Sequence, residues 1–573
     1  MKVSRATLSL GLTAILAISA CSSTSSPAAT QQAQPSVPAA SSQASEAPAT
    51  PAPPPPSQAP SQQPLRVGWQ SEPDTMNPLT TYSTEAQEVL QLVYDKLLNY
   101  DLNLKPEPEL ATDYSYEADG LSITFKLRTG VSWHDGTPFT SADVKYTYDT
   151  IHDNELGQYA QWLTHLTAVE TPDDATVVLK FDKPQAFNPA LVIPILPKHI
   201  WSSMTAKEIE TFTNDKPVGT GPFTFVEWKK GASVTIARNA SFWGPPPGPA
   251  SVTWVLYGNG DVMAQALRNG EVDILPEVPP TVYDGLTGVD GVTSVALPSF
   301  SFHHIGFNVS TNAKSGGNPL LREKVVRQAL SLALDRDQLV QIALAGHGQP
   351  GDSIIPAGMT DWHLAIPPDQ QLSGNPDKAK QMLDAAGYAM DASTGVRKAA
   401  NGKPLEFRLI AIETTDVDVR AAQLFRDAAQ TIGIKLDLQT LDENTLGNTV
   451  YNADAPNWDI FVWGWDSGVP DPDYMLGVPL CNQIGGNNDV YYCNKQYDTL
   501  YDQQSTTVDP VARKTIVDQM QKTYYDDAAY IVMWYQDKLQ AYRTDTWGGW
   551  TQVQGGMIFN FTRDNYLKIT PAS

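Results

Sequence analysis

Side chains that could carry out chemistry are present in this chain of 573 residues, but their spacing does not match known catalytic arrangements. Asp471 and Asp473 could act as the acid and base of a glycosidase, yet the Pro472 between them favours a structural turn. His303 and His304 are adjacent, so on a strand they would point to opposite faces and could not chelate one metal. No G-x-S-x-G, H-E-x-x-H or phosphate-loop motif is present. We therefore expect no enzyme activity, no metal site and no cofactor.

The N-terminus has the features of an export signal, over residues 1–20. Lys2 and Arg5 precede an apolar stretch at residues 6–18, which is too short and too broken by Ser and Thr to span a bilayer permanently. Residues 18–21 read ISAC and resemble the bacterial lipobox, in which the cysteine sulfur takes a diacylglycerol. Cys21 is therefore the expected lipidation site. The alternative is an ordinary secretory signal in which this cysteine has no role.

The other two cysteines bear on the compartment. If Cys21 is lipidated, Cys481 and Cys493 remain as an even pair in a segment rich in Gly and Asn, as expected of one disulfide in an oxidising compartment. The alternative is two free thiols in a cytosolic loop, which conflicts with the export signal.

Residues 21–63 form the predicted tether. They are almost entirely Ser, Ala, Pro, Gln and Thr, and they include an unbroken proline run at residues 53–56. Such a segment has too little apolar surface to offset the entropy of ordering, so it should stay extended. The folded part is expected to begin near Leu65.

Composition restricts the possible partners. The formal net charge of -24 argues against nucleic acid, because a phosphate backbone requires a basic face. Hydrophobic residues make up 41% of the chain, and about 510 residues after the tether can form two or three cores.

Segments with helix and strand patterns alternate, which favours α/β lobes over a helical bundle or a β-sandwich. Strands are predicted at residues 65–69, 122–127, 176–181, 304–308, 405–411, 435–439 and 459–463. Helices are predicted at residues 86–98, 379–386, 419–432 and 511–524, with another striped by Val325, Ala329, Leu332 and Ala333.

Several stretches resemble the family 5 solute-binding proteins, the group that contains the bacterial dipeptide- and oligopeptide-binding proteins. The most specific is ITFKLRTGVSWHDGTPFTSADV at residues 123–144, a strand, a turn and a helix start that Thr140 or Ser141 can cap. The further matches, in family order, are VGTGPF (218–223), RNASFW (238–243), LREKVVRQALSLALDRDQL (321–339), NPDKAKQMLDAAGY (375–388) and WGWDSGVPDPDY (463–474). Cys481 and Cys493 also occupy the place of a disulfide in dipeptide-binding members.

The resemblance implies a two-lobed α/β fold of the periplasmic-binding-protein type (type II), with an extra subdomain in lobe I. Lobe I is expected at residues 64–300 with the inserted subdomain at about 105–215. Lobe II is expected at residues 301–535, and residues 536–573 return to lobe I. Two strands between the lobes would form a hinge that lets them close on a ligand.

The same resemblance implies where a ligand binds. It puts Tyr82 and Thr84 in the loop that lines the groove of oligopeptide-binding members, although Tyr82 is equally well explained as a surface aromatic. The segment that starts at Trp463 should supply a tryptophan and a carboxylate for the α-amino group of a peptide. In the alignment the family's carboxylate falls on Gly468, and Asp466 could replace it. The expected ligand-binding residues are Tyr82, Thr84, Trp463, Trp465, Asp466 and Ser467.

The resemblance therefore implies a receptor that captures a di- or oligopeptide and delivers it to the permease and ATPase of an ABC importer. The chain should be a monomer, attached by lipid to the outer face of the cell membrane, on the periplasmic side. The 14 Trp and 23 Tyr residues suit sugar rings as well as peptide side chains, so an oligosaccharide or another neutral solute is the alternative ligand, with metal chelates and opines as further ones. A secreted hydrolase and a sensory lipoprotein of the same fold are the rival functions.

Overall fold

The computed structural model describes residues 61–558 and 563–572. The expected export signal, Cys21 and the tether up to residue 60 lie outside the described residues. Residues Ala59–Ser573 form one compact unit. Among the described residues, no helix is long and apolar enough to cross a membrane.

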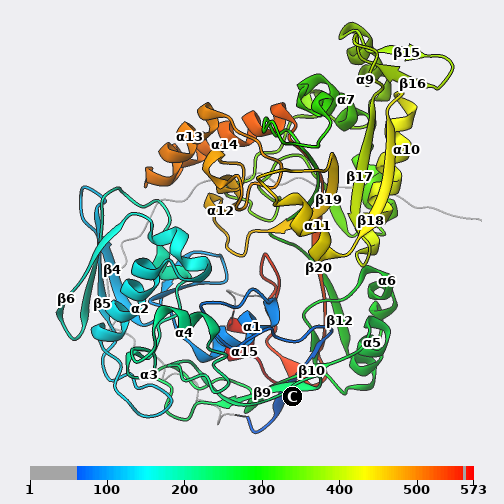
Figure 1. Cartoon of the computed structure of the whole chain (residues 1–573). Coiled ribbons are helices and arrows are strands. Elements are labelled where there is room, and N and C mark those ends of the chain that lie inside the picture. Colours follow the sequence, from blue (N-terminus) through cyan, green and yellow to red (C-terminus); the bar gives the residue numbers. More distant parts are fainter. Residues whose placement is uncertain (1–60, 559–562, 573) are drawn as a thin grey trace, which may run out of the picture. The chain divides into compact units, whose positions relative to one another are not determined.

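A mixed sheet organises this unit and has 12 strands in the part of the chain that the structure describes. Helices pack against it, so the predicted α/β class is confirmed (Figure 1). The strand order is β18-β17-β19-β13-β20-β11-β1-β10-β9-β8, and β12 and β14 also pair with β20. The strands are β1 (Pro64–Trp69), β8 (Phe223–Lys229), β9 (Ser233–Arg238), β10 (Ser251–Leu256), β11 (Ile274–Leu275), β12 (Val292–Pro298), β13 (Ser301–Phe307), β14 (Gly348–Pro350), β17 (Glu406–Ile412), β18 (Lys435–Leu441), β19 (Ile460–Asp466) and β20 (Tyr530–Arg543).

Strand alternation on β19 divides its side chains between two cores. Ile460 and Val462 pack into the core formed with α7 (Lys324–Ala333) and α10 (Asp416–Thr431). Phe461 lies on the other face and belongs to a second core. Because successive side chains on a strand point to opposite faces, Trp463 and Trp465 share the face of Phe461.

β20 is shared between the two lobes. Its first part pairs with β13 and β14, and its second part, from Asp537, pairs with β12 and β11. β12 and β13 follow one another along the chain, so they cross between the lobes beside β20 (Figure 1). The division into lobe I (64–300, returning at 536–573) and lobe II (301–535) remains our proposal, and this pairing supports it.

A second, antiparallel sheet with the order β4-β5-β7-β6 lies in the segment proposed as the extra subdomain. The adjacent helix α2 (Ser141–Asn154) begins with a capping box: Thr140 accepts the Ala142 N–H at 3.3 Å, and Asp143 accepts the Thr140 N–H at 2.9 Å. The prediction that this segment starts a capped helix is confirmed. The strands are β4 (Ala111–Tyr116), β5 (Ser122–Leu127), β6 (Leu166–Asp173) and β7 (Thr176–Phe181).

One predicted helix ends earlier than its apolar pattern indicates. Helix α1 runs over Thr84–Val93, whereas residues 86–98 were expected to be helical. The Val93 carbonyl instead accepts the Gly221 N–H at 2.9 Å, and the Asp95 carbonyl accepts the Ile195 N–H at 3.0 Å. These tertiary hydrogen bonds replace the helical ones, so Leu98 begins a short strand.

The remaining predicted helices and strands are present, with ends shifted by a few residues, as is usual for such boundaries. The other elements are β2 (Leu98–Tyr100), β3 (Pro106–Pro108), β15 (Ala389–Asp391), β16 (Val396–Lys398), β21 (Trp547–Gly548), β22 (Thr570–Pro571), α3 (Lys198–Trp201), α4 (Ala206–Thr211), α5 (Gly260–Asn269), α6 (Pro280–Tyr283), α8 (Arg336–Ala343), α9 (Pro376–Ala385), α11 (Glu443–Val450), α12 (Asp473–Gly477), α13 (Lys495–Thr506), α14 (Pro510–Asp527) and α15 (Asp564–Lys568).

Candidate functional site

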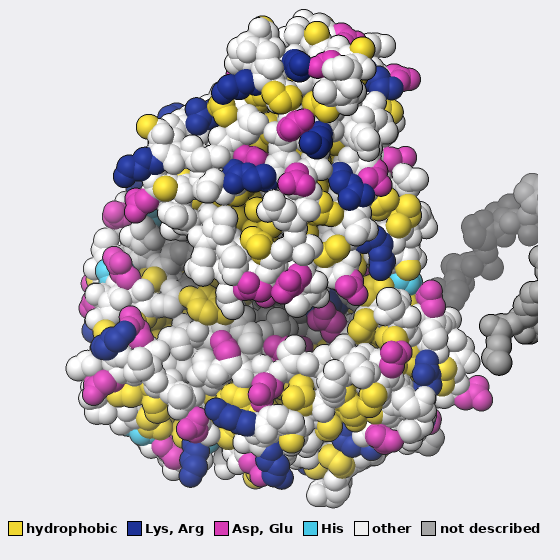
Figure 2. Space-filling view, turned by 45° about the vertical axis from the view of Figure 1, so that its right-hand side comes forward, with side chains coloured by type: hydrophobic (Ala, Val, Ile, Leu, Met, Phe, Trp, Pro, Cys, Tyr) yellow, Lys and Arg dark blue, Asp and Glu magenta, His cyan; other side chains and the backbone are white. Residues whose placement is uncertain are grey.

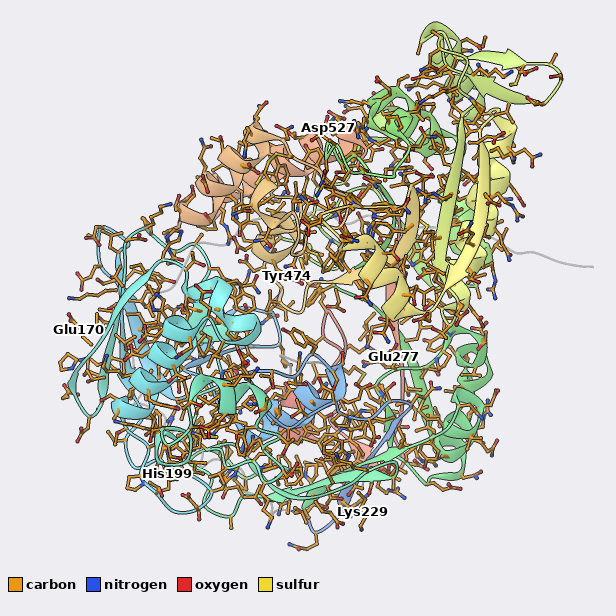
Figure 3. All side chains as sticks on the ribbon, viewed as in Figure 1. Glu170, His199, Lys229, Glu277, Tyr474 and Asp527 are labelled. Atoms are coloured by element: carbon orange, nitrogen blue, oxygen red, sulfur yellow. A yellow bond between two sulfur atoms is a disulfide. The ribbon has the colours of Figure 1, made fainter. Side chains whose placement is uncertain are left out.

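Two adjoining cavities lie between residues of the proposed lobes, and Thr84 and Asp466 line both of them. The large cavity has a volume of about 720 Å³ and the small cavity one of about 490 Å³, within the range of small-molecule sites. Figure 2 shows the molecule hollowed at this level, with acidic side chains near the rim. In Figure 3, Glu277 of the large cavity and Tyr474 of the small cavity come from opposite sides of this space.

All six residues expected to bind ligand lie at these cavities. Trp463 and Trp465 line the large cavity, Tyr82 and Ser467 line the small one, and Thr84 and Asp466 line both. The structure therefore brings together two segments that are almost 400 residues apart in the sequence. Tyr82 is 73% exposed, so its ring is available at the mouth of the small cavity.

The two tryptophans are held by a buried carboxylate that sequence reasoning missed. Asp489 is fully buried, and its Oδ2 accepts the indole N–H of Trp463 at 2.9 Å and that of Trp465 at 3.1 Å. The Tyr530 hydroxyl donates to Oδ1 of the same carboxylate. Tyr451 stacks on Trp463 with the ring centroids 5.6 Å apart. The indole rings are therefore fixed in orientation before any ligand arrives.

Asp466 is the carboxylate at the junction of the cavities. It ends β19 and remains exposed, and its Oδ1 accepts the Gly468 N–H at 2.8 Å. The cavity walls displace bulk water and thereby raise the pKa of Asp466, although the Gly468 N–H and the Lys538 ammonium lower it. A cation beside the Asp466 carboxylate would stabilise its charged form and so offset the effect of lost hydration.

Other charged groups of the large cavity are mostly acidic, namely Glu277, Asp418, Glu443 and Asp537. The Lys538 ammonium donates to Glu277 at 3.0 Å. Burial disfavours the charge of Lys538, but Glu277 outweighs burial and raises the pKa of this lysine. The large cavity therefore has excess negative charge around one paired cation.

A histidine pairs with one of these acids. His303 Nδ1 lies 2.7 Å from the Asp418 carboxylate, and the imidazole stacks on Trp534 with the centroids 5.3 Å apart. On the neighbouring strand Gly464 faces His303, and a Cβ there would lie 2.9 Å from the imidazole Nε2. His304 is buried on the opposite face, beside Asp489, so the prediction that the two histidines face opposite ways is confirmed.

The suspected carboxylate pair is fully engaged in structural contacts. Arg513 donates two hydrogen bonds to Asp471, at 2.7 and 2.8 Å. Asp473 accepts from Gln504 at 2.7 Å and from Tyr501 at 3.1 Å. Neither acid lines the described cavities, and no group of three or more metal-ligating side chains occurs among the described residues.

Cys481 and Cys493, the pair expected to be bonded, are joined by a disulfide. The loop that it closes carries Asp489 and also Gln483 and Asn487, two amide residues of the small cavity. Proximity in sequence to the cysteine pair was the one signal for these residues. The contacts that Asp489 and His303 make had no local signal, because their partners come from distant segments of the chain.

Comparison with known proteins shows extensive similarity. The family model described as "Bacterial extracellular solute-binding proteins, family 5 Middle" matches residues 105–487. The chain is 29% identical to Protein XP55 of Streptomyces lividans over 85% of this chain and 86% of that protein. It is 28% identical to the oligopeptide-binding protein AppA of Bacillus subtilis over 83% and 87% of the two chains. The structure of AppA in complex with a nonapeptide superposes on this chain with a TM-score of 0.74 and 26% identity. The match covers 89% of this chain and 100% of the AppA chain.

Proposed function

The chain belongs to family 5 of the bacterial extracellular solute-binding proteins, and on that basis we propose that it captures a short peptide between its lobes for an ABC importer. The observation that carries this proposal is the exposed carboxylate of Asp466 at the junction of the cavities, beside the oriented rings of Trp463 and Trp465. The α-amino group of a peptide has the charge and hydrogen-bond donors that this carboxylate requires.

The state of Asp466 supports an ammonium ligand. Oδ1 accepts the Gly468 N–H, whereas Oδ2 accepts no hydrogen bond from any described residue. Because enclosure raises the pKa of Asp466, a cationic partner gains more here than at an open surface. The carboxylate thereby assumes the role that the family alignment assigns to position 468.

The relatives support a peptide as the ligand. AppA of Bacillus subtilis is an oligopeptide-binding protein, and its structure with a nonapeptide covers 89% of this chain. The indole faces of Trp463 and Trp465 offer apolar surface to peptide side chains. Lobe closure about the two strand crossings would bury the peptide and present a distinct loaded form to the importer.

A neutral oligosaccharide is the second candidate, favoured by the walls of the small cavity. Its aromatic lining includes Tyr82, Tyr159, Trp162 and Tyr474. Aromatic faces of this kind suit the apolar faces of sugar rings as well as peptide side chains. A ligand of this class would not depend on the charge of Asp466.

We propose the cellular setting together with the function. A diacylglycerol on Cys21 would hold the monomeric receptor at the outer face of the cell membrane, on the periplasmic side, and the tether would extend the folded unit toward the permease and ATPase complex. In this role the protein binds and releases its ligand without chemical change. A sensory role would require a membrane signalling partner in place of the permease.

A thermal-shift screen of the full chain tests the proposal, with free di- to pentapeptides, the same peptides N-acetylated, and a panel of oligosaccharides. A ligand present at 100 times its Kd stabilises the folded state by about 2.7 kcal/mol. We expect free peptides to stabilise the protein, and Asp466→Asn or N-acetylation to remove most of this effect. Asp454→Asn, an exposed position outside both cavities, is the matched control. Stabilisation by sugars alone would contradict the peptide proposal.

A further inference from the structure

Lys96 stands out because its ammonium lies in a confined place and has no hydrogen-bond or ion-pair partner among the described residues. It lies between α1 and β2, lines the small cavity and is partly buried. No described residue accepts a hydrogen bond from its Nζ or forms an ion pair with it. Burial lowers the pKa of Lys96 against the raising effect of Glu109, so the charge has lost hydration that the protein does not fully replace.

The backbone of Lys96 is held rigidly. Its N–H donates to the Glu109 carboxylate at 2.9 Å, and its carbonyl accepts the Leu110 N–H at 3.0 Å. A rigid base of this kind limits where the side chain can place its ammonium, which reduces the ordering cost of binding.

The nearby acids Asp95 and Glu109 have Arg563 as their ion-pair partner. The Arg563 guanidinium donates to Asp95 at 2.6 Å and forms an ion pair with Glu109. Thr220 and the Trp243 indole donate to the second oxygen of Asp95, at 2.9 and 2.8 Å. Lys96 can therefore contribute to the charge balance of this cluster while its three N–H donors remain available.

The charges of the small cavity form a complementary pair. Its described lining contains one carboxylate, Asp466 from lobe II, and one ammonium, Lys96 from lobe I. The lysine of the large cavity, Lys538, already has Glu277 as its partner. A ligand with an ammonium at one end and a carboxylate at the other would pair with both walls.

We propose that Lys96 binds a carboxylate of the ligand, so that the small cavity selects peptides with a free carboxylate. This inference rests on the proposed peptide function and adds a specificity that the function does not require. The carboxylate can be the C-terminal group or an Asp or Glu side chain, and both would form the same charge-assisted hydrogen bonds. Bridging opposite charges on the two lobes would also favour closure.

Isothermal titration of the full chain tests the inference with tri- to pentapeptides prepared as free acids and as C-terminal amides. We expect the acids to bind about 10- to 100-fold more tightly than the amides, the change produced by losing one charge-assisted hydrogen bond. Peptide amides that contain one internal Glu identify which carboxylate binds. If they bind as tightly as the free acids, a side-chain carboxylate is sufficient. If they bind as weakly as the other amides, the carboxylate must be the C-terminal one.

Lys96→Met should abolish the preference for acids over amides, whereas Lys96→Arg should retain it. Lys403→Met, at an exposed position outside both cavities, is the matched control. A purely structural role would lower the thermal stability and affect both peptide forms equally. Equal binding of acids and amides to the unaltered protein would overturn the inference without any variant, while the proposed function would stand. Failure of every peptide to bind would overturn both.

Discussion

Trp463 and Trp465 share a single hydrogen-bond acceptor, because both indole nitrogens point at the same oxygen of the buried Asp489 carboxylate. The two rings occupy alternate positions on β19 and face the large cavity. The orientation of both rings therefore depends on one acid that lies outside the cavities. This relationship makes Asp489 a positioning residue for the site.

Replacement of Asp489 should loosen both rings. Asp489→Asn replaces one acceptor oxygen by an NH₂ group, which is itself a donor. At least one of the buried donors from Trp463, Trp465 and Tyr530 would then lose its acceptor. We expect the free energy of unfolding to fall by about 1–3 kcal/mol, with weaker ligand binding and altered tryptophan fluorescence. Urea unfolding and titration measure these effects, and Asp369→Asn at an exposed position is the control. Ligand affinity equal to that of the unaltered protein would show that the rings are held by packing alone.

The His303–Asp418 pair should make stability depend on pH. Burial disfavours the charge of His303, but Asp418 outweighs it and raises the pKa of the imidazole above its ordinary value. Trp534 stacks on this ring, whereas the adjacent His304 is buried on the opposite face of the strand, beside Asp489. Because the folded state holds the proton more tightly, the stabilisation is present below the unfolded pKa, near 6.5, and is lost as pH rises through the folded pKa.

His303→Asn isolates this effect, since it retains a donor for Asp418 but cannot become charged. We expect the variant to be less stable than the unaltered protein by about 1–3 kcal/mol at pH 6, and the difference to shrink by pH 9. Urea unfolding at both pH values measures the difference, and His152→Gln, at a partly exposed position on α2, controls for the general loss of an imidazole. A difference independent of pH would mean that the imidazole is neutral in the folded protein.

Removing the disulfide should weaken both stability and binding. The cysteines are 12 residues apart, and closing a loop of this size stabilises the folded state by about 3 kcal/mol in the chain-entropy model. We expect the double variant Cys481→Ser and Cys493→Ser to lose about this much and to bind ligand less tightly, because the loop carries Asp489. Thermal unfolding and titration test this, with the reduced unaltered protein as the matched comparison. Normal affinity in the reduced protein would show that packing alone holds Asp489.

Much of the architecture could be predicted from local patterns. Alternating apolar residues predicted the strands at residues 122–127 and 176–181, and the residues at the start of α2 predicted a capped helix. The end of α1 could not be predicted in this way, because the Val93 carbonyl accepts from Gly221, which lies more than 120 residues away in the sequence. An apolar pattern reports burial, but it does not report which donor satisfies a backbone carbonyl.

By itself, the sequence determined the α/β class, the family resemblance and the two segments that line the cavities, since these depend on residue types and short-range spacing. Only the tertiary structure decided the hydrogen bonding at the site: that Asp489 orients both tryptophans, that His303 pairs with Asp418, and that no described residue pairs with the Lys96 ammonium. The physical reason is that hydrogen bonds and charge pairs act over a few ångströms. The residues that form them come from segments that become neighbours only when the lobes have folded.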